Sequence, residues 1–576
     1  MTHRSVSLFV AAVAAAVSLH VHPATATDLV ESRYDVVIAG GTTAALAAAF
    51  AAADDGATVA LLEPTDWIGG QLTASAVPAV DEAWHKVRAN ADVHGGGGDA
   101  GGEVLLNVSA VARDPRNITP FLRDALLATG NPGQGWVSRF CFEPRPFMER
   151  FLIPRERELA GRLTVYRETV VKQVETAGER IDAIIAVART PIPGVAAAGY
   201  DRFPSEDLAD WYSPTDSERF AKTVHRFTGA VFIDATEWGE VMALADAPLL
   251  QGVEVVDGEL ATHDTCGQSI TYCFVQEMHA AAVADHPAIE DVGNMGLGAY
   301  AERPDAWQKI WTYRRIKGDG GEASPGELCL QNWGYDVERD EGGNDYPFAY
   351  LFLDADRTAA QRDDWQGGVD VGVLAAAEKR ALAWHEWFRN ASPDGVDPDQ
   401  ITLNGEVLGT GHGLAKLPYI RDTRRSVGVG GFLLKFEDLI APVEGGRLTR
   451  RTGTEFPDRV ALGAYPADIH PLVGCKYPEH VHVNHPTMPF YLPLRALTND
   501  GFANLMVAGK TMAQTFVANS ATRLHPIEWS SGVAAGVVAA DLAGSGATTA
   551  EACDDHERLR QRVARHTPVD WVFPGE

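Results

Sequence analysis

The chain has 576 residues, of which 45% are hydrophobic and 22% are charged, a composition typical of a globular protein that is too long for a single compact core. Its formal net charge of −29 argues against a nucleic acid or an anionic membrane as a partner, because their phosphate groups would repel it. We therefore expect two interleaved domains and neither of those partners.

The first 26 residues predict a cleavable export signal. Arg4 gives a positive start, residues 5–19 form an apolar run, and Ala24-Thr25-Ala26 supplies small residues for cleavage. The run is shorter than the roughly 20 residues of a membrane-spanning helix, and no later stretch offers such a span. We expect a periplasmic or secreted protein with no membrane span in the mature chain; an uncleaved anchor is the alternative.

The next patterned stretch predicts a strand, a glycine turn, a helix and a second strand that ends on an acid. Val36–Ala39 is an apolar run suited to a strand buried on both faces, and Gly40-Gly41 interrupts it. Ala44–Ala53 favours a helix, and residues 58–62 form a second apolar strand before Glu63. Such a βαβ unit places a pyrophosphate at a helix N-terminus and a carboxylate on a ribose hydroxyl.

The turn departs from the full G-x-G-x-x-G fingerprint. When Gly40 is its first glycine, Thr42 and Ala45 occupy the other two glycine positions, so the Thr42 side chain has to turn away from the phosphates. Glu63 follows Gly40 by 23 residues, close to the spacing of about 20 expected for the ribose-binding acid. On the turn alone, an ordinary βαβ unit without a ligand is the alternative.

With the turn Gly69-Gly70-Gln71, the sequence resembles the FAD-dependent oxidoreductases of the glutathione-reductase-like superfamily, above all a large bacterial group of that name. In that group the first motif commonly has the pattern Gly-Gly-Thr-x-x-Gly, so Thr42 matches it and Ala45 departs. The resemblance recurs at residues 231–239 and 504–510. It implies FAD as the cofactor, bound by Gly40, Gly41, Thr42, Ala45, Glu63, Gly69, Gly70, Gln71, Asp234, Gly509, Ser531 and Gly532.

Short apolar or alternating strands follow at residues 163–166, 169–174 and 181–187, after a helical pattern over residues 142–161. The resemblance implies that these strands form a three-stranded antiparallel insert across the nucleotide-binding sheet. Residues 94–102 are glycine-rich and lack the Gly-Lys-Ser/Thr ending of a phosphate loop, so they predict a flexible surface connection.

The six cysteines include no C-x-x-C pair, which argues against a zinc site and a thioredoxin-like centre. We expect no bound metal. In an exported chain some cysteines can form disulfides, and Cys266 with Cys273 is the most plausible local pair. Cys141 is expected to be buried rather than reactive.

Residues 246–485 change character, with many tryptophans, tyrosines and prolines, and we assign them to a substrate domain that caps the flavin. Helices are expected at residues 372–389 and, broken by Pro304, at residues 299–317. Three clusters there could carry chemistry. They are residues 331–334 with 344–346, a composition suited to a polar or sugar-like ligand; residues 417–425 with Arg421, Arg424 and Arg425; and residues 464–471 with Asp468 and His470.

The C-terminal part repeats the pattern of a buried strand followed by a glycine and a small-residue helix. Residues 505–508 form the strand, and the helix is expected from Val533 to Leu542. Ser531 and Gly532 would then lie at its N-terminus, where unpaired N–H groups suit the negatively charged edge of a reduced flavin.

Arg523, His525 and Glu528 precede the expected helix, so we expect them near the flavin ring. His525 is the first candidate for the base that removes a substrate proton, His470 is the second, and Arg523 would polarise a substrate oxygen.

The expected fold is α/β: a Rossmann-like FAD-binding domain with a parallel sheet and an antiparallel insert, plus a capping α+β substrate domain. We expect an export signal at residues 1–26, an FAD-binding domain made of residues 30–245 and 486–545, a capping domain at residues 246–485 and a C-terminal extension at residues 546–576. The expected function is hydride transfer from a small polar organic substrate to FAD, with the electron acceptor left open. The alternatives are an enzyme that reduces FAD with another donor, and a carbohydrate-binding envelope protein on a flavoprotein scaffold.

Overall fold

The computed structural model describes residues 29–88, 104–195, 199–254, 262–283, 293–444, 447–475, 477 and 484–576. The expected export signal, the glycine-rich residues 94–102 and the side chain of His263 lie outside the described residues. No helix among the described residues is both long and apolar enough to cross a membrane.

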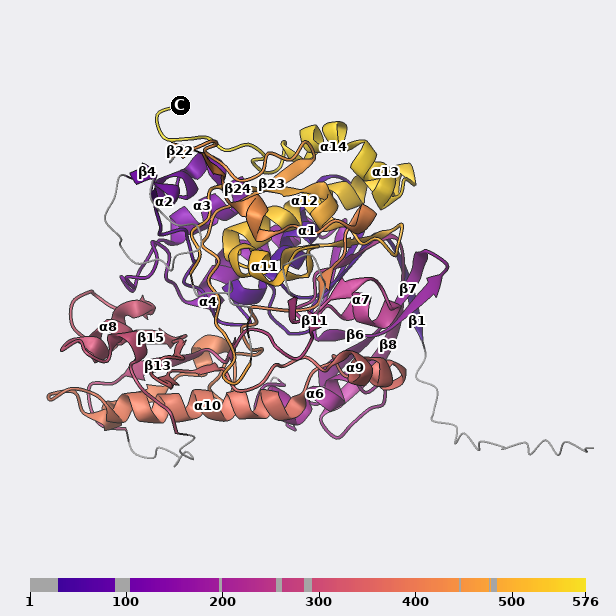
Figure 1. The fold of residues 1–576 in the computed structure, drawn as a ribbon. Coiled ribbons are helices and arrows are strands. Elements are labelled where there is room, and N and C mark those ends of the chain that lie inside the picture. Colours follow the sequence, from indigo (N-terminus) through magenta and orange to yellow (C-terminus); the bar gives the residue numbers. More distant parts are fainter. Residues whose placement is uncertain are drawn as a thin grey trace, which may run out of the picture.

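A parallel sheet forms the centre of the molecule (Figure 1). Its order is β5-β2-β1-β8-β25, with the strands β1 (Val30–Ala39), β2 (Val59–Leu62), β5 (Leu163–Tyr166), β8 (Phe220–Asp234) and β25 (Leu505–Val507). The apolar runs at the carboxyl ends of β1 and β2 are buried throughout, as both-face burial requires. The last strand comes from the distant C-terminal part of the chain, so the two parts form one domain core.

An antiparallel hairpin extends this sheet, as expected, but its membership differs from the prediction. The strands β6 (Thr169–Ala177) and β7 (Arg180–Pro191) pair with each other, and β7 pairs with the first half of β8, from Phe220 to Thr228. The strand β5, which was expected in the insert, instead pairs in parallel with β2. Strand propensity alone does not distinguish these pairings, because partner choice depends on the path of the whole chain.

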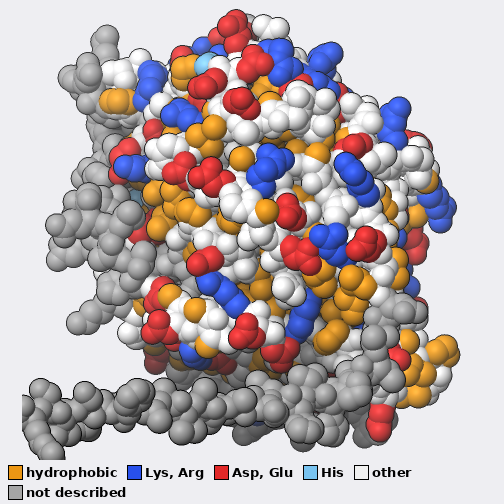
Figure 2. Space-filling model, turned by 90° about the vertical axis from the view of Figure 1, so that its right-hand side faces the viewer, with side chains coloured by type: hydrophobic (Ala, Val, Ile, Leu, Met, Phe, Trp, Pro, Cys, Tyr) orange, Lys and Arg blue, Asp and Glu red, His pale blue; other side chains and the backbone are white. Residues whose placement is uncertain are grey.

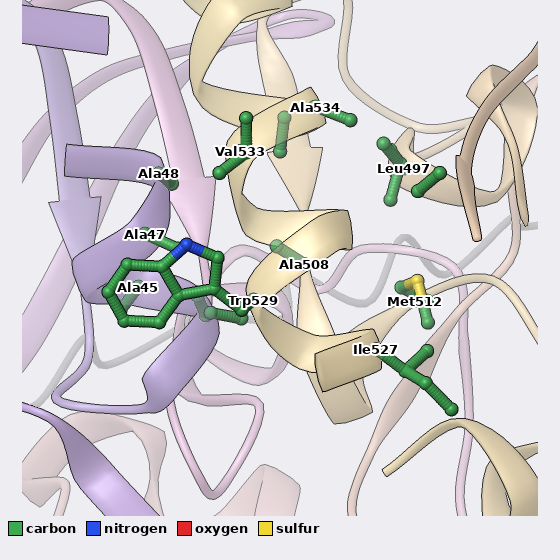
Figure 3. Packing of buried hydrophobic residues seen from close by; sticks show 14 of the residues in the cluster. Ala45, Ala47, Ala48, Leu497, Ala508, Met512, Ile527, Trp529, Val533 and Ala534 are labelled. Carbon is green, nitrogen blue, oxygen red and sulfur yellow. The ribbon is translucent and has the colours of Figure 1, made fainter. Parts of the chain in front are cut away.

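Two small-residue helices cross over the nucleotide-binding part of the sheet (Figure 3). They are α1 (Thr43–Asp54) and α12 (His525–Ser545). A Cβ at Gly532 would lie 2.2 Å from the Ala44 carbonyl oxygen, and one at Gly536 would lie 2.2 Å from that of Ala48. These two glycines, one turn apart, therefore allow the two backbones to touch.

The helix α12 begins eight residues earlier than the expected start at Val533. Pro526 occupies its first turn, a position that tolerates the missing N–H group. Ser530 and Ser531 suggested a helix start by composition, but both lie buried in the second turn.

The capping region contains a four-stranded antiparallel sheet with helices against it, at the lower left of Figure 1. Its order is β14 (Arg315–Lys317), β15 (Leu328–Gln331), β13 (Phe274–Met278) and β19 (Ile401–Leu403). The long helix α10 (Val371–Asn390) and the shorter α8 (Ala306–Tyr313) contribute aromatic side chains. Trp307 stacks on Phe388 with ring centroids 5.0 Å apart, and both side chains are buried.

The remaining helices and helical turns join these units. They are α2 (Val108–Ala112), α3 (Pro120–Thr129), α4 (Pro144–Phe147), a π turn (Met148–Leu152), α5 (Ile153–Glu158), α6 (Pro204–Tyr212), α7 (Glu240–Ala245), α9 (Ala355–Gln361), α11 (Phe516–Thr522), α13 (Thr549–Asp554) and α14 (His556–Val563).

A disulfide joins Cys266 to Cys475, with Cα atoms 5.9 Å apart, across 209 residues of the chain. The predicted local pair Cys266–Cys273 is therefore wrong, and Cys273 is a buried free thiol. Cys273 directly precedes β13 and is buried in the core, so its closeness to Cys266 in the sequence does not bring the two sulfur atoms together. Cys141 is buried, as expected, and burial raises its pKa to about 12.

On the face shown in Figure 2, acidic and basic side chains are interspersed with hydrophobic ones. The excess of acidic residues is therefore not gathered into a single patch on that face.

Candidate active site

The glycine turn after β1 is shaped by its neighbours in the fold. Gly40 has a φ of +113°, and a Cβ there would lie 2.2 Å from the Ala235 carbonyl oxygen. The Thr42 hydroxyl accepts a hydrogen bond from the Ala45 N–H (3.0 Å) and donates one to Ala235 O (2.8 Å). The Thr42 side chain thus caps α1 by accepting from the Ala45 N–H, and it directs its own hydroxyl proton to the residue that follows β8.

Glu63, at the end of β2, has one oxygen engaged and one free. Its Oε1 accepts from the Thr65 N–H (2.9 Å) and hydroxyl (2.8 Å), whereas Oε2 is buried without a hydrogen-bond partner in the described part of the chain. Burial raises the pKa of this carboxyl to about 8. A Cβ at Gly41 would lie 2.3 Å from Oε1, so this glycine makes room for the carboxylate.

The turn Gly69-Gly70-Gln71 packs on the N-terminus of α1. Thr43 donates its hydroxyl to Gly69 O (2.9 Å), and a Cβ at Gly70 would lie 2.5 Å from the Thr43 nitrogen. Gln71 Nε2 donates to the Arg523 carbonyl oxygen (3.1 Å), 452 residues away along the chain. The predicted residues of the N-terminal and C-terminal motifs therefore meet at one place.

Asp234, in contrast, has a structural side chain. Its Oδ1 accepts from the Thr236 N–H and hydroxyl, and its Oδ2 accepts from the Met242 N–H (3.0 Å), which ties the end of β8 to α7. Neither oxygen is left for a cofactor, so only the backbone of this segment fits the predicted role.

Ser531 and Gly532 do not occupy a helix N-terminus. The Ser531 hydroxyl accepts from the Gly509 N–H (3.2 Å) and donates to the Glu528 carbonyl oxygen (2.9 Å), while Gly532 lies at the crossing with α1. The predicted direct cofactor contact of both is corrected to a packing role, because the helix starts at His525 instead.

Lys510 and Glu528 form a buried ion pair; Glu528 was expected near the flavin ring, but its pairing with Lys510 was not predicted. Lys510 Nζ lies 2.8 Å from Glu528 Oε1 and 2.9 Å from Oε2 of Glu237. Burial raises the pKa of Glu528 to about 7, against the effect of Lys510. The only local signal was a lysine directly after the Gly509 that ends a buried strand.

A cavity of about 440 Å³ is lined by residues of the capping region, by Asp81 and Glu82, and by Arg523. All three clusters named from the capping sequence contribute to it: Asn332 to Gly334, Arg421, and Asp468 to His470. They come from segments more than 40 residues apart in the chain. Tyr465 and Arg523 complete this part of the wall.

His470 is held between two carboxylates. Its Nδ1 lies 2.7 Å from Asp345 Oδ2, and its Nε2 lies 3.1 Å from Asp468 Oδ2. Burial opposes the charged imidazolium, but the two carboxylates outweigh it, so the pKa of His470 is raised. The pKa values of Asp345 and Asp468 are lowered, because their arginine and histidine neighbours outweigh burial.

Two arginines stand beside this histidine. Arg421 donates to Asp345 Oδ1 (3.1 Å) and to Ser269 O (3.0 Å). Arg523 donates to Asp468 O (3.0 Å) and to the Tyr419 hydroxyl. The Nε–H groups of both arginines are buried without a partner among the described residues. Arg424 and Arg425 point elsewhere, each bonded to main-chain carbonyls and to buried polar side chains.

His525, the first candidate base, does not line this cavity. It is fully buried: Nε2 lies 2.7 Å from Val77 O, and Nδ1 accepts from the Asp81 N–H at 3.4 Å. Burial lowers its pKa to about 4. Both ring nitrogens bond the main chain, so the structure favours a structural role for His525 and leaves His470, the second candidate, facing the cavity.

A short segment connects this site to the nucleotide end. Leu417 lines a smaller cavity with Gly40, Gly41 and Glu63, and Tyr419, two residues on, lines the large one. The segment from Leu417 to Tyr419 thus lies between the small cavity beside the glycine turn and the large polar and aromatic cavity.

The family model described as FAD dependent oxidoreductase matches residues 35–200 and 217–563. No curated protein matches the chain. Among solved structures, E. coli quinol fumarate reductase FrdA is similar at 11% identity and a TM-score of 0.31, over 93% of this chain and 74% of that one. A myxobacterial halogenase, CndH, is similar at 10% identity and a TM-score of 0.30, over 92% and 79%. L-proline dehydrogenase from P. horikoshii is matched over 25% of its own length and 39% of this chain, at 14% identity and a TM-score of 0.16.

Proposed function

Because the chain belongs to the FAD dependent oxidoreductase family, and is thus an enzyme with FAD as its cofactor, we propose that it oxidises a small polar organic substrate in the 440 Å³ cavity. The observation that carries the proposal is His470, bonded to the buried Asp345 on one side and facing the cavity on the other.

The residues at the nucleotide end fit FAD. The free Oε2 of Glu63 can accept hydrogen bonds from ribose hydroxyls, and the first turn of α1 offers N–H groups to a diphosphate. When bound, FAD supplies the acceptor for two electrons and a proton equivalent.

The protein must take the other proton from the substrate. The carboxylate of Asp345 on Nδ1 holds the imidazole in one orientation, so Nε2 can serve as the proton acceptor once the ring is neutral. Asp468 competes for that nitrogen at 3.1 Å, and its side chain can yield to a substrate hydroxyl because it lies at the cavity wall.

Arg421 and Arg523 would stabilise a substrate oxygen as it loses its proton. Both are permanently charged and buried, so their attraction for a developing negative charge is little screened. Their Nε–H groups have no hydrogen-bond partner among the residues that the structure describes.

Anaerobic bleaching of the flavin by a panel of alcohols, amines, hydroxy acids and saccharides tests this proposal. We expect at least one compound to bleach the wild type, and His470→Gln to slow that bleaching about 100-fold or more. His279→Gln is the matched control, since His279 bonds Thr402 and does not line the cavity. Bleaching only by a reduced nicotinamide would instead support the alternative, an enzyme that reduces FAD with another donor.

We also propose export to the periplasm or medium, on the basis of Arg4 and the apolar residues 5–19. The disulfide Cys266–Cys475 agrees with an oxidising compartment. N-terminal sequencing of the natural protein should find Thr27 first, and an intact Met1 would contradict cleavage.

A further inference from the structure

Granted the oxidation proposed above, we infer that the substrate is an oligosaccharide, whose terminal sugar unit enters the 440 Å³ cavity and whose next unit lies on an aromatic surface around Phe348. The cavity walls, their charge balance and the aromatic residues outside carry this inference. The cavity volume lies in the range of about 300–1,000 Å³ typical of small-ligand pockets.

One wall of the cavity is aromatic. Trp333 contacts Tyr300 and Tyr313, with ring centroids 5.2 Å and 5.3 Å apart, and all three line the cavity. Trp84, on the lining as well, is 52% exposed. The C–H face of a sugar ring is apolar enough to pack on an indole, so these aromatic side chains suit a saccharide.

The charged lining favours a neutral ligand with many hydroxyls. Its carboxylates are Asp81, Glu82, Asp336, Glu338 and Asp468. Its cationic groups are Arg314, Arg421, Arg523 and His470. A net anion or cation would meet repulsion from one of these sets, and an apolar ligand would leave the polar groups desolvated. Hydroxyl groups both donate and accept, so they can satisfy both sets.

The unpartnered donors point the same way. The Nε–H groups of Arg314, Arg421 and Arg523 are all buried without a hydrogen-bond partner among the described residues. Buried polar groups are almost always bonded, and the hydroxyl oxygens of a saccharide at this cavity would be suitable acceptors for these three donors.

The aromatic surface continues out of the cavity, which argues for more than one sugar unit. Tyr335 lines the cavity and contacts Phe348, with ring centroids 5.7 Å apart, and Phe348 contacts Tyr346 at 5.6 Å. Phe348 is 40% exposed, and the Arg380 guanidinium lies 5.6 Å from its ring centroid. The Phe348 ring is thus partly exposed next to the cavity, and its contacts with Arg380, Tyr335 and Tyr346 keep it in place.

The test measures binding and bleaching separately on the FAD-loaded enzyme. Calorimetric titration uses glucose, cellobiose, maltose and xylobiose, and anaerobic absorbance follows the flavin with the same sugars, an aliphatic alcohol, an amino acid and a hydroxy acid. We expect at least one disaccharide to bind and to bleach the flavin. Trp333→Ala should weaken its binding about 10-fold, with Trp387→Phe, on α10 outside the cavity, as the matched control.

Phe348→Ala separates the two binding units. It should weaken disaccharide binding several-fold and leave glucose binding unchanged, whereas Trp333→Ala should weaken both. If a non-saccharide bleaches the flavin and no saccharide binds, the substrate inference is overturned while the proposed oxidation stands. If a disaccharide binds in the Trp333-dependent manner but nothing bleaches the flavin, the proposed oxidation fails and the saccharide site stands. Equal effects of Phe348→Ala on both sugars would overturn the second unit.

Discussion

At the scale of single residues, two buried acids and one histidine decide what this site can do. Glu63 is buried with a free oxygen, and Asp345 orients His470 at the cavity. The shifted pKa of each of these three side chains follows from the balance between burial and a small number of charged or polar neighbours.

Above pH 8, where Glu63 is ionised, replacing it with Gln should weaken FAD binding about 10-fold to 100-fold, because hydrogen bonds to a charged acceptor contribute roughly 1.5–3 kcal/mol. Fluorescence titration of the FAD-free protein measures this loss. An unchanged affinity would show that the ribose does not bind there.

The same variant has a pH signature in the FAD-free protein. The pKa of Glu63 is raised from 4.5 to about 8 by burial, so the folded state holds this proton more tightly than the unfolded state does. Stability from this group is present below pH 4.5 and is lost as the pH rises to about 8. The melting temperature of the wild type should therefore fall relative to that of Glu63→Gln across this window. Parallel melting curves would contradict the buried carboxyl.

The pH dependence of flavin bleaching should report His470. A base must be neutral, and the two carboxylates raise the pKa of His470, so the bleaching rate should rise with pH through a value above 6.5. Asp468→Asn removes one of these carboxylates, and the rising limb should then move to lower pH. If the rise of the bleaching rate stays at the same pH in Asp468→Asn, a group other than His470 causes it.

At the scale of elements, the crossing of α1 and α12 joins the two ends of the chain. Gly532 and Gly536 face the Ala44 and Ala48 carbonyls, and Figure 3 shows Trp529 and Val533 of α12 beside the alanines of α1. Because the crossing places Gln71 and Arg523 in contact, it also sets the distance between the nucleotide end and the large cavity.

Gly532→Ala should therefore destabilise the protein by about 1–3 kcal/mol, the usual cost of overpacking. Gly544→Ala in the same helix is the matched control, since no atom lies within 4 Å of its added Cβ, and alanine there should be neutral or stabilise by up to about 1 kcal/mol. Thermal denaturation of the two variants compares them directly. Equal melting temperatures would argue against a tight crossing.

At the scale of the whole molecule, the proposed cofactor site is built from segments at both ends of the chain and in its middle. FAD should thus stabilise the fold by an amount that grows with the logarithm of its concentration, about 2.7 kcal/mol at 100 times the dissociation constant. ADP, which contains only the nucleotide end, should give part of this stabilisation.

Thermal shift with ADP distinguishes the two ends of the site. The ADP shift should be lost in Glu63→Gln and kept in Asp468→Asn, because Asp468 lines the other cavity. Loss of the ADP shift in both variants would mean that the nucleotide site and the large cavity do not bind their ligands independently.

The sequence by itself determined the nucleotide-binding half. The apolar runs, the glycine turn, the alanine helix and the acid after the second strand are local features, and each is specified by neighbours along the chain. The family, the cofactor and the joining of both chain ends in one sheet followed from these motifs. The clusters that line the large cavity were also visible, as polar groups among aromatic residues.

Only the tertiary structure decided which of these residues meet. It brought Asp345, Arg421 and His470 together across the capping region, placed His525 against the main chain of Val77 and Asp81, and paired Cys266 with Cys475. It also places Gly532 at the crossing with α1, and Ser531 against the Gly509 N–H, instead of at a helix N-terminus. Local patterns specify elements, whereas the partners of a buried polar side chain are set by long-range packing, which no short stretch of sequence encodes.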